Sequence, residues 1–405
     1  MDVTIAPIPP EKYEDYRCEV IFKAYKWDPQ CGDRDTVSRH ACLLSQEAAR
    51  KLEEWSEALT AELFLMERKL LDDLPLGKEL WLEKKILKAF RRSQGPAGYN
   101  PQKHVRLMRY DFHPTADGWA LSEVNSDVPC GFAESVILPE IVKKFFNGYA
   151  GHRNIAQSIC DSFKSKLKVD RVAFVHATSY SEDRQVMQYL SDCFAQRGIG
   201  GIFAAPDHIR WDGSRAYCLL DNREIGGIMR SYPAEWLTML HKKYWEGYYS
   251  ADIPLCNHPV ALLTQSKRLP LVWDKLGLEL PTWRKLLPET RDPRKIPVGS
   301  DEWIYKIAMG RVGGGIAIKG AVKDKEFKEI NKAARRNPKE WVAQRLFKSL
   351  PLGEDNLHLC LGVFTVDGKA AGFYGRAGSY NLIDAYAADI PVLVNTEERM
   401  GNKNV

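Results

Sequence analysis

Two runs of alternating polar and apolar residues constrain this chain more than any other segment. HVRLMRYDFH (104–113) and WALSEVNSD (119–127) flank PTADG, which is rich in turn-forming residues. Successive side chains of a strand point to opposite faces, and Pro, Asp and Gly between two such runs favour a tight connection. The pattern therefore predicts a β-hairpin whose residues can be assigned to faces.

Four polar residues fall on one face of this predicted hairpin. Arg109 and Asp111 share a face of the first strand, and Glu123 and Asn125 share a face of the second. For a turn centred near Ala116, Arg109 is expected opposite Glu123, with all four side chains on the same side. Two carboxylates and an amide oxygen suit magnesium, and an arginine beside them can neutralise carboxylate or phosphate charge. An exposed face held by salt bridges is the alternative.

The rest of the chain, 405 residues in all, is long enough for two or three packed lobes. Apolar residues three and four apart over 44–92 predict two helices, with Ser45 as an N-cap and a break near Pro75. A strand, a helix and a second strand between 168 and 205 predict a small α/β lobe. The predicted divisions are 1–150 with the helices and hairpin, 151–260 with the small lobe, and 261–405 with mixed elements.

A glycine-rich loop lies between two apolar runs in WIYKIAMGRVGGGIAIKG (303–320). The backbone amides of a loop such as 310–315 can approach phosphates closely, and Lys306 in the preceding run is placed to reach a phosphate. The loop lacks the G-K-[ST] ending of a P-loop, and no G-x-G-x-x-G precedes a helix. A nucleotide loop of another kind is therefore predicted, with a ligand-free turn as the alternative.

Two isolated cations add to this pattern. Lys267 precedes an apolar stretch and is placed to enter a nucleotide pocket, although alone it resembles an ordinary surface lysine. Arg376 lies between glycines near the end of a predicted strand, where a cation can meet a transferring phosphoryl group. Asp127 and Glu134 follow the hairpin and are expected to be solvated or to cap a helix.

Several other chemistries are disfavoured by the sequence. The nine His show no ligand spacing, and the nine Cys form no C-x-x-C pair, which favours reduced thiols. Cys130, between Pro and Gly, has no companion motif for a nucleophile, and no G-x-S-x-G is present. The net charge of +5 is small, and no aromatic-interleaved basic stripe indicates nucleic-acid binding. Without a long apolar run or a signal-like start, a cytoplasmic protein that does not enter membranes is expected.

Together these features resemble the synthetase portion of the glutathionylspermidine synthase family, roughly from Tyr25 to Val394. The sharpest likeness is RYDF (109–112) followed by SEVNSD (122–127), where the family has R-[FY]-D-F and E-[YV]-N-[AS]-D at the same spacing. Looser likenesses follow in the family's order: SEDRQVMQYLSDC (181–193), MRSYPAEW (229–236), SKRLPLVW (266–273), WIYK (303–306), VAQRLF (342–347) and AAGFYGR (370–376). The resemblance implies an α/β (α+β) chain with a circularly permuted ATP-grasp fold, mixed sheets and a small inserted α/β lobe.

By that resemblance, Asp111, Glu123 and Asn125 would bind magnesium ions (Mg²⁺) that bridge the phosphates of ATP. Arg109 and Arg376 would hold the substrate carboxylate and the transferring γ-phosphoryl group. The implied reaction joins a small-molecule or peptide carboxylate to an amine through an acyl-phosphate. An ATP phosphotransferase or ATPase without ligation, and an inactive nucleotide-binding scaffold, are the alternatives.

The resemblance also implies the contacts to ATP. Lys267 and Lys306 would contact the nucleotide, and Gln344 would lie near the adenine. The loop containing Gly313 and Gly314 would close over the phosphates and exclude water from the acyl-phosphate. Two departures concern these contacts: Ser precedes Lys267 where Asn is more usual, and GRVGGG is richer in glycine than the family's Ser-Arg-Glu-Gly type. The residues that would select the family's own substrates, glutathione and spermidine, are not matched in this sequence, so the resemblance does not extend to the identity of the acid and the amine.

Overall fold

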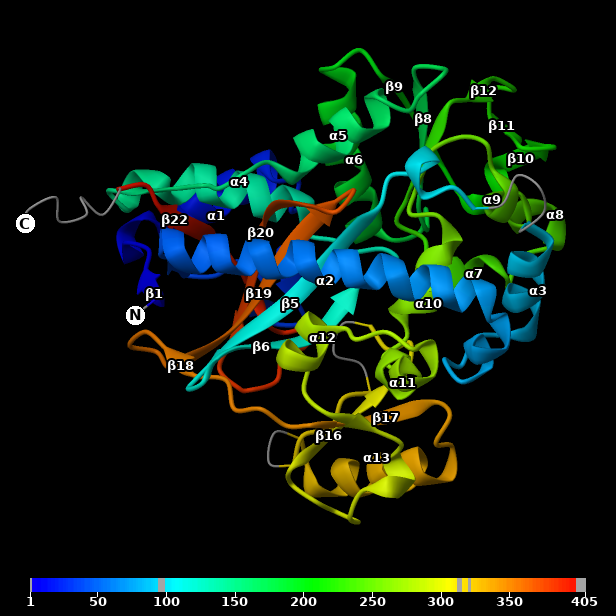
Figure 1. Ribbon diagram of the computed structural model, residues 1–405. Helices are drawn as coiled ribbons and strands as arrows, with labels where there is room; N and C mark the ends of the chain where they lie inside the picture. The colour runs from blue at the N-terminus through cyan, green and yellow to red at the C-terminus, as the bar shows by residue number, and fades with distance from the viewer. Residues whose placement is uncertain (1, 94–98, 312–314, 320–321, 398–405) are drawn as a thin grey trace, which may run out of the picture.

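A computed structural model describes residues 2–93, 99–311, 315–319 and 322–397 (Figure 1). Its centre is an antiparallel sheet with the strand order β21-β20-β19-β5-β6, and β18 also pairs with β19. The strands are β5 (Leu107–Thr115), β6 (Gly118–Asn125), β18 (Pro351–Leu352), β19 (Leu357–Val366), β20 (Lys369–Gly378) and β21 (Ala388–Ile390). The predicted hairpin is therefore β5 and β6, and its neighbours come from the last third of the chain.

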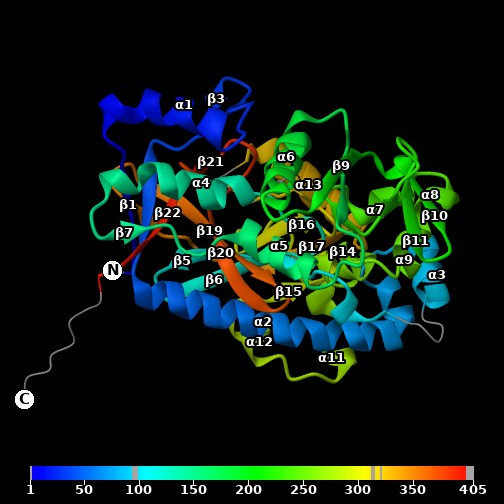
Figure 2. The same cartoon turned by 90° about the horizontal axis from the view of Figure 1, so that it is seen from above.

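Helices cover the central sheet on both sides. The long helix α2 (Gln46–Asp72) runs across one face, as Figures 1 and 2 show, and buries its apolar stripe there. The rings of Trp55 and Phe112 stack at this contact with centroids 6.4 Å apart. On the other side α4 (Phe132–Val142) packs on β20, with α1 (Tyr13–Lys23) outside it (Figure 2). The sheet thus has one fully covered apolar face and one face that is only partly covered.

The N-terminus of α2 is determined by a residue that the sequence already indicates. Ser45 is the N-cap as predicted, and its Oγ accepts a hydrogen bond from the backbone amide of Ala48 at 3.1 Å. Replacing Ser45 by Ala should lower the free energy of unfolding by about 1 kcal/mol, because this amide loses its partner. Ser45→Asp retains an acceptor and should keep most of the stability. Chemical denaturation of both variants measures the difference, and equal losses would contradict the capping role.

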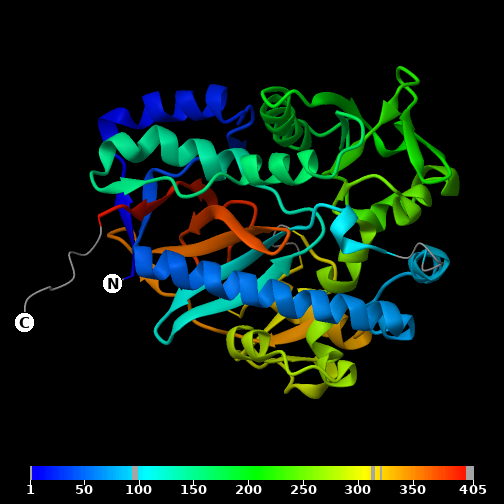
Figure 3. The same cartoon turned by 45° about the horizontal axis from the view of Figure 1, so that its top comes forward.

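The small α/β lobe contains a parallel sheet with the order β14-β13-β8-β9. The predicted strand, helix and strand are confirmed as β8 (Arg171–Val175), α6 (Ser181–Ala195) and β9 (Gly200–Ala204). The other two strands are β13 (Gly227–Arg230) and β14 (Leu255–Cys256). In Figure 3 this lobe lies beside α4, on the same side of the central sheet.

A third region lies at the opposite end of the molecule, below the central sheet in Figures 1 and 3. Its sheet has the order β15-β17-β16, and α13 (Asp324–Arg336) covers it around Tyr305 and Phe327. The strands are β15 (Thr290–Arg291), β16 (Trp303–Ile307) and β17 (Trp341–Arg345). The strand that carries Lys306 therefore belongs to a small core of its own.

A fourth sheet joins the two ends of the described chain in the order β1-β4-β22-β7. Its strands are β1 (Val3–Pro7), β4 (His40–Leu44), β7 (Tyr149–Ala150) and β22 (Val392–Asn395). The remaining β-strands and α-helices are β2 (Gln30–Cys31), β3 (Arg34–Asp35), α3 (Lys84–Ser93), α5 (Ile155–Lys164), β10 (Ile209–Asp212), β11 (Arg215–Cys218), β12 (Glu224–Ile225), α7 (Ala234–Leu237), α8 (Lys242–Trp245), α9 (Gly247–Ser250), α10 (Leu262–Gln265), α11 (Trp273–Leu276) and α12 (Pro281–Leu286). The predicted division at 150 and 260 stays a prediction, because the central sheet draws strands from the first and last segments.

None of the described helices combines the length with the apolar composition that crossing a bilayer requires.

Candidate active site

The partly covered face of the central sheet forms a wall of a cavity of about 500 Å³. The hairpin, the start of α6, strands β16 and β17, and strands β20 and β21 all contribute to the lining. Seven of the predicted site residues line it: Arg109, Asp111, Glu123, Asn125, Lys306, Gln344 and Arg376. Lys267 joins this group through an ion pair with Glu123. Gly313 and Gly314 lie outside the described residues.

The hairpin register differs from the prediction, although the shared face agrees with it. Arg109 lies opposite Asn125, and Asp111 lies opposite Glu123, so the expected Arg109–Glu123 pair is wrong. The tight turn pairs Thr115 with Gly118, and the register shifts between Asp111 and Phe112. Such an irregularity adds one residue to a strand, which simple alternation cannot reveal. The two carboxylates consequently face each other directly across the hairpin.

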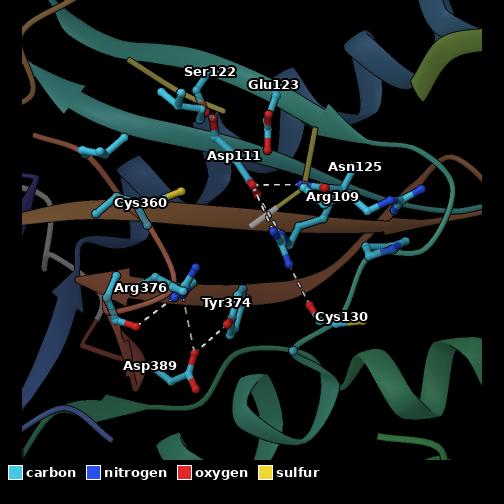
Figure 4. A pocket seen from close by; sticks show the side chains of 18 of the residues that line it. Arg109, Asp111, Ser122, Glu123, Asn125, Cys130, Cys360, Tyr374, Arg376 and Asp389 are labelled. Atoms are coloured by element: carbon cyan, nitrogen blue, oxygen red, sulfur yellow. Dashed lines mark hydrogen bonds and ion pairs between the residues drawn. The ribbon is translucent and has the colours of Figure 1, made fainter. Parts of the chain in front are cut away.

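A cation and an amide hold the first of these carboxylates (Figure 4). Arg109 donates from Nε to Oδ1 of Asp111 at 2.7 Å and from Nη2 to Oδ2 at 3.0 Å. Asn125 Nδ2 donates to Oδ2 of the same carboxylate at 2.9 Å. A Cβ at Gly362 would lie 2.6 Å from Cδ of Arg109, so glycine at this position leaves the space that the Arg109 side chain occupies. The carboxylate is therefore fixed and charge-balanced within the cavity wall.

Two lysines hold the second carboxylate. Lys267 Nζ lies 2.9 Å from Oε2 of Glu123, and Lys306 lies close by. Burial alone would raise the pKa of Glu123, but the two ammonium groups outweigh it and lower the pKa to about 2. Burial lowers the pKa of Lys306 to about 8, which the charge of Glu123 only partly offsets. The carboxylate is thus ionised, and its surroundings are rich in positive charge.

The lysines also connect this carboxylate to the residues that are predicted to contact the nucleotide. Lys306 Nζ donates to Oε1 of Gln344 at 2.7 Å and to the Ser122 carbonyl at 3.1 Å. Lys267 Nζ donates to the carbonyl of Gly310, the first residue of the glycine-rich loop, at 2.8 Å. Strands β16 and β17 bring Lys306 and Gln344 together because Ile304 pairs with Gln344 in the ladder. The loop, the two lysines and the hairpin therefore meet at one place.

The remaining predicted cation, Arg376, comes from β20 on the same face. Its Nη2 donates to the carbonyls of Asp384 at 2.7 Å and Ala387 at 2.9 Å. Its Nε lies 4.0 Å from Oδ1 of Asp389, which accepts a hydrogen bond from Tyr374 (Figure 4). Backbone carbonyls fix the position of the guanidinium and leave its charge only partly neutralised. Arg376 and Arg109 are thus two oriented cations in one cavity.

Cys130 also lies in this cavity but is not prepared as a nucleophile. Burial raises the pKa of its thiol to about 11, and the nearby charge of Asp183 adds to this effect. A thiol with this pKa carries almost no thiolate at neutral pH. Its backbone carbonyl instead accepts a hydrogen bond from Nη1 of Arg109 at 2.7 Å, so the residue helps to orient this arginine.

Asp127 and Glu134 correct a prediction, since neither is solvated. Asp127 is completely buried and forms an ion pair with Arg230 of the small lobe. Its carboxylate also accepts from the backbone amide of Ala234 at 2.9 Å. Glu134 lies within α4 and is 8 % exposed. Sequence reasoning missed both because their partners are distant in the chain, although an acid directly after a metal-type motif was a signal for Asp127.

A further set of buried polar groups fixes the chain just after Asn125. Gln265 Oε1 accepts from the backbone amides of Ser126 and Asp127, each at 2.8 Å. Asn257 Nδ2 donates to the carbonyl of Asp127 at 2.7 Å. These side chains come from 130 or more residues later, and Gln265 lies two residues before Lys267. The end of β6 and the start of the Lys267 segment are therefore held together.

The donor set on the hairpin fits magnesium by its chemistry. Asp111 and Glu123 supply two opposed carboxylates and Asn125 an amide oxygen, which are hard oxygen ligands. Across the described ranges no group of three or more His, Cys, Asp or Glu side chains is arranged to hold a metal. An Mg²⁺ ion bound to nucleotide phosphates needs only one or two protein carboxylates, so the smaller set suffices for that kind of site.

Comparison with known proteins gives a family match and a number of similar solved structures. No curated protein matches the chain. A crystal structure from Methylobacillus flagellatus KT, described as a "putative gamma-glutamylcysteine synthetase", has a TM-score of 0.46 and 14% identity, and the match covers 82% of this chain and 88% of that chain. The family described as glutathionylspermidine synthase preATP-grasp matches residues 11–395, nearly the whole chain. The chain therefore belongs to the glutathionylspermidine synthase preATP-grasp family.

Proposed function

We propose that this protein is an ATP- and Mg²⁺-dependent ligase that joins a carboxylate to an amine through an acyl-phosphate. The observation that carries the proposal is the pair of opposed carboxylates in the cavity wall, Asp111 and Glu123. Three cations balance them: Arg109, Lys267 and Lys306. Opposed carboxylates ringed by cations suit a metal–phosphate complex better than an apolar ligand. Membership of the family supports the same class of reaction.

In this proposal Asp111, Glu123 and Asn125 would hold Mg²⁺. The metal, when bound, would neutralise phosphate charge and so favour transfer of the γ-phosphoryl group. Arg109 and Lys267, which now balance these carboxylates, would then be free to interact with phosphate or carboxylate oxygens of the substrates. The cations therefore have a role both before and after the substrates bind.

The third region would hold the nucleotide. Lys306 and Gln344 lie side by side, and the apolar residues Ile304, Leu346 and Phe347 line the same cavity. An ammonium group is suited to phosphate, whereas an amide and an apolar wall are suited to a purine base. ATP would thus lie with its base toward β16 and β17 and its phosphates toward the hairpin.

Arg109 and Arg376 would orient the acid substrate and the transferring group. An oxygen of the substrate carboxylate attacks the γ-phosphorus, and ADP leaves with the pair of electrons of the broken P–O bond. The amine then attacks the acyl carbon, inorganic phosphate leaves with the original carboxylate oxygen, and the nitrogen loses a proton. Fixed guanidinium groups stabilise the charge that develops on these oxygens without further reorganisation.

The test is an ADP-release screen with ATP, Mg²⁺ and crossed pools of acids and amines, with mass detection of products. For any active pair, the acid is labelled with heavy oxygen in its carboxylate. A ligase delivers one labelled oxygen to phosphate. A kinase acting on a hydroxyl group leaves the phosphoryl group on its substrate, and an ATPase releases unlabelled phosphate; either result overturns the proposal. Nucleotide binding without turnover in any pool would favour the scaffold alternative.

A further inference from the structure

A lysine from the N-terminal segment enters the acid-lined part of the same cavity. Lys26 lines the cavity with a side chain that is only 12 % exposed. Its ammonium contacts Oδ2 of Asp389 and lies 3.2 Å from Oε1 of Glu134. Burial lowers the pKa of Lys26, but the two carboxylates outweigh this and raise it, so the group carries its charge. A fixed positive charge therefore forms part of the wall.

The chain around Lys26 is anchored so that this side chain points inward. Tyr25 donates from its hydroxyl to Asp192 of α6 at 2.5 Å, and the backbone amide of Trp27 donates to Gln185 of the same helix at 3.1 Å. Tyr25 also has a φ of 57°, a conformation that costs energy for a bulky residue and persists only where the surroundings enforce it. The residues on both sides of Lys26 thus fix its direction.

The two carboxylates that hold Lys26 are suited to an ammonium group. Oδ1 of Asp389 accepts from Tyr374 at 2.5 Å, which leaves Oδ2 for the lysine. Oε2 of Glu134 is buried and, within the described chain, has no hydrogen-bond partner. In the absence of Lys26 this place would present two buried carboxylates to the cavity, and a substrate ammonium would be drawn to them.

Of the cavity carboxylates that are not exposed to solvent, one has no cation beside it in the part of the chain that the structure describes. Asp28 and Glu182 also line the cavity without an ion pair, but both are exposed at its edge. Asp183, at the start of α6, lines the cavity and accepts from Ser231 at 3.3 Å. Burial raises its pKa, and no ion pair to it is found among the residues that the structure describes. One amine can therefore be balanced at Asp183. A second ammonium would meet the charge of Lys26, and like charges in a buried site repel strongly.

We infer that Lys26 is a specificity-determining residue whose own ammonium fills the place that a second ammonium of a diamine or polyamine would take. The amine substrate accordingly carries a single positive charge, as in a monoamine or the amino group of an amino acid. This inference rests on the proposed function, because it concerns the amine that the ligase would use.

The first test needs no variant and no turnover. Calorimetry compares the affinity of the wild-type protein for α,ω-diamines of three to eight carbons with that for the n-alkylamines of equal length. Diamines should bind no more tightly than the matched monoamines. A preference of about tenfold or more for a diamine, as expected when two linked groups bind together, would overturn the inference.

The second test removes the lysine. Lys26→Ala frees both the carboxylates and the space. At least one diamine should then bind about tenfold more tightly than the monoamine of equal length. Lys26→Met fills the space and should show a smaller gain, and Asp389→Asn in the Lys26→Ala background should abolish it. If folded Lys26→Ala had the same ratio of diamine to monoamine affinity as the wild-type protein, Lys26 would only support the fold, and the inference would be overturned. Absence of ADP release with all acid–amine pools would instead refute the proposed ligase, so the two failures are distinct.

Discussion

Replacing Asp111 by Asn or Glu123 by Gln should reduce ATP turnover by at least about a hundredfold to a thousandfold. Each change removes one of the two carboxylate charges that face each other across β5 and β6. An amide cannot supply the negative charge that holds a magnesium–phosphate complex. ADP release at saturating ATP, measured over a range of Mg²⁺ concentrations, is the readout.

These variants should also lose some stability. Glu123→Gln leaves Lys267 and Lys306 beside each other without their shared carboxylate, and loss of a hydrogen bond to a charged group costs about 1.5–3 kcal/mol. The depressed pKa of Glu123 means that its contribution is present near neutral pH and is lost as the pH falls toward about 2. Thermal denaturation at pH 7 separates this loss from the loss of turnover.

Asp117→Asn is the matched control. Asp117 lies exposed in the turn of the same hairpin, so the same chemical change there should leave both turnover and stability close to wild type. Normal turnover in both Asp111→Asn and Glu123→Gln would remove these residues from the metal site and, with them, the main support for the proposed function.

The largest effect on stability is expected at Asp127. Replacing Asp127 by Ala should lower the free energy of unfolding by about 3–5 kcal/mol, because Arg230 would remain buried with an unpaired charge. The two side chains are 0 % and 1 % exposed, so water cannot replace the missing carboxylate. Chemical denaturation followed by tryptophan fluorescence measures the change.

An exposed ion pair provides the comparison. Nη1 of Arg345 lies 2.6 Å from Oε2 of Glu302, and the two side chains are 44 % and 66 % exposed. Glu302→Ala should therefore cost no more than about 1 kcal/mol. Similar losses in Asp127→Ala and Glu302→Ala would mean that burial does not decide the strength of the Asp127–Arg230 contact.

Local patterns in the sequence predicted the elements well. The cap at Ser45, the break after α2, the order of β8, α6 and β9, and the shared face of the hairpin all depend on residues close together in the chain. The family itself was recognisable because RYDF and SEVNSD lie on adjacent strands at a fixed spacing. In each case neighbouring residues carry the signal.

Features that depend on distant residues could not be predicted in the same way. The irregular register beside Phe112 changes which residues face each other but leaves the alternation readable. The burial of Asp127 depends on Arg230, and the position of Lys26 depends on Asp389 near the other end of the chain. An acid or a lysine without its partner looks like an ordinary surface residue, which explains why these groups were missed.

The place of the hairpin in the central sheet has a consequence for synthesis on the ribosome. Asp111 pairs in the ladder with Gly362 of β19, so the strand beside the carboxylates is made 251 residues later than Asp111 itself. While residues up to the third region emerge, the hairpin has a free edge and Arg109 lacks the ring of Tyr374 beneath it. Pairing across such a separation forms slowly, and an uncovered strand edge is prone to join other chains. The nascent protein should therefore depend on protection of this edge until β19 and β20 leave the exit tunnel.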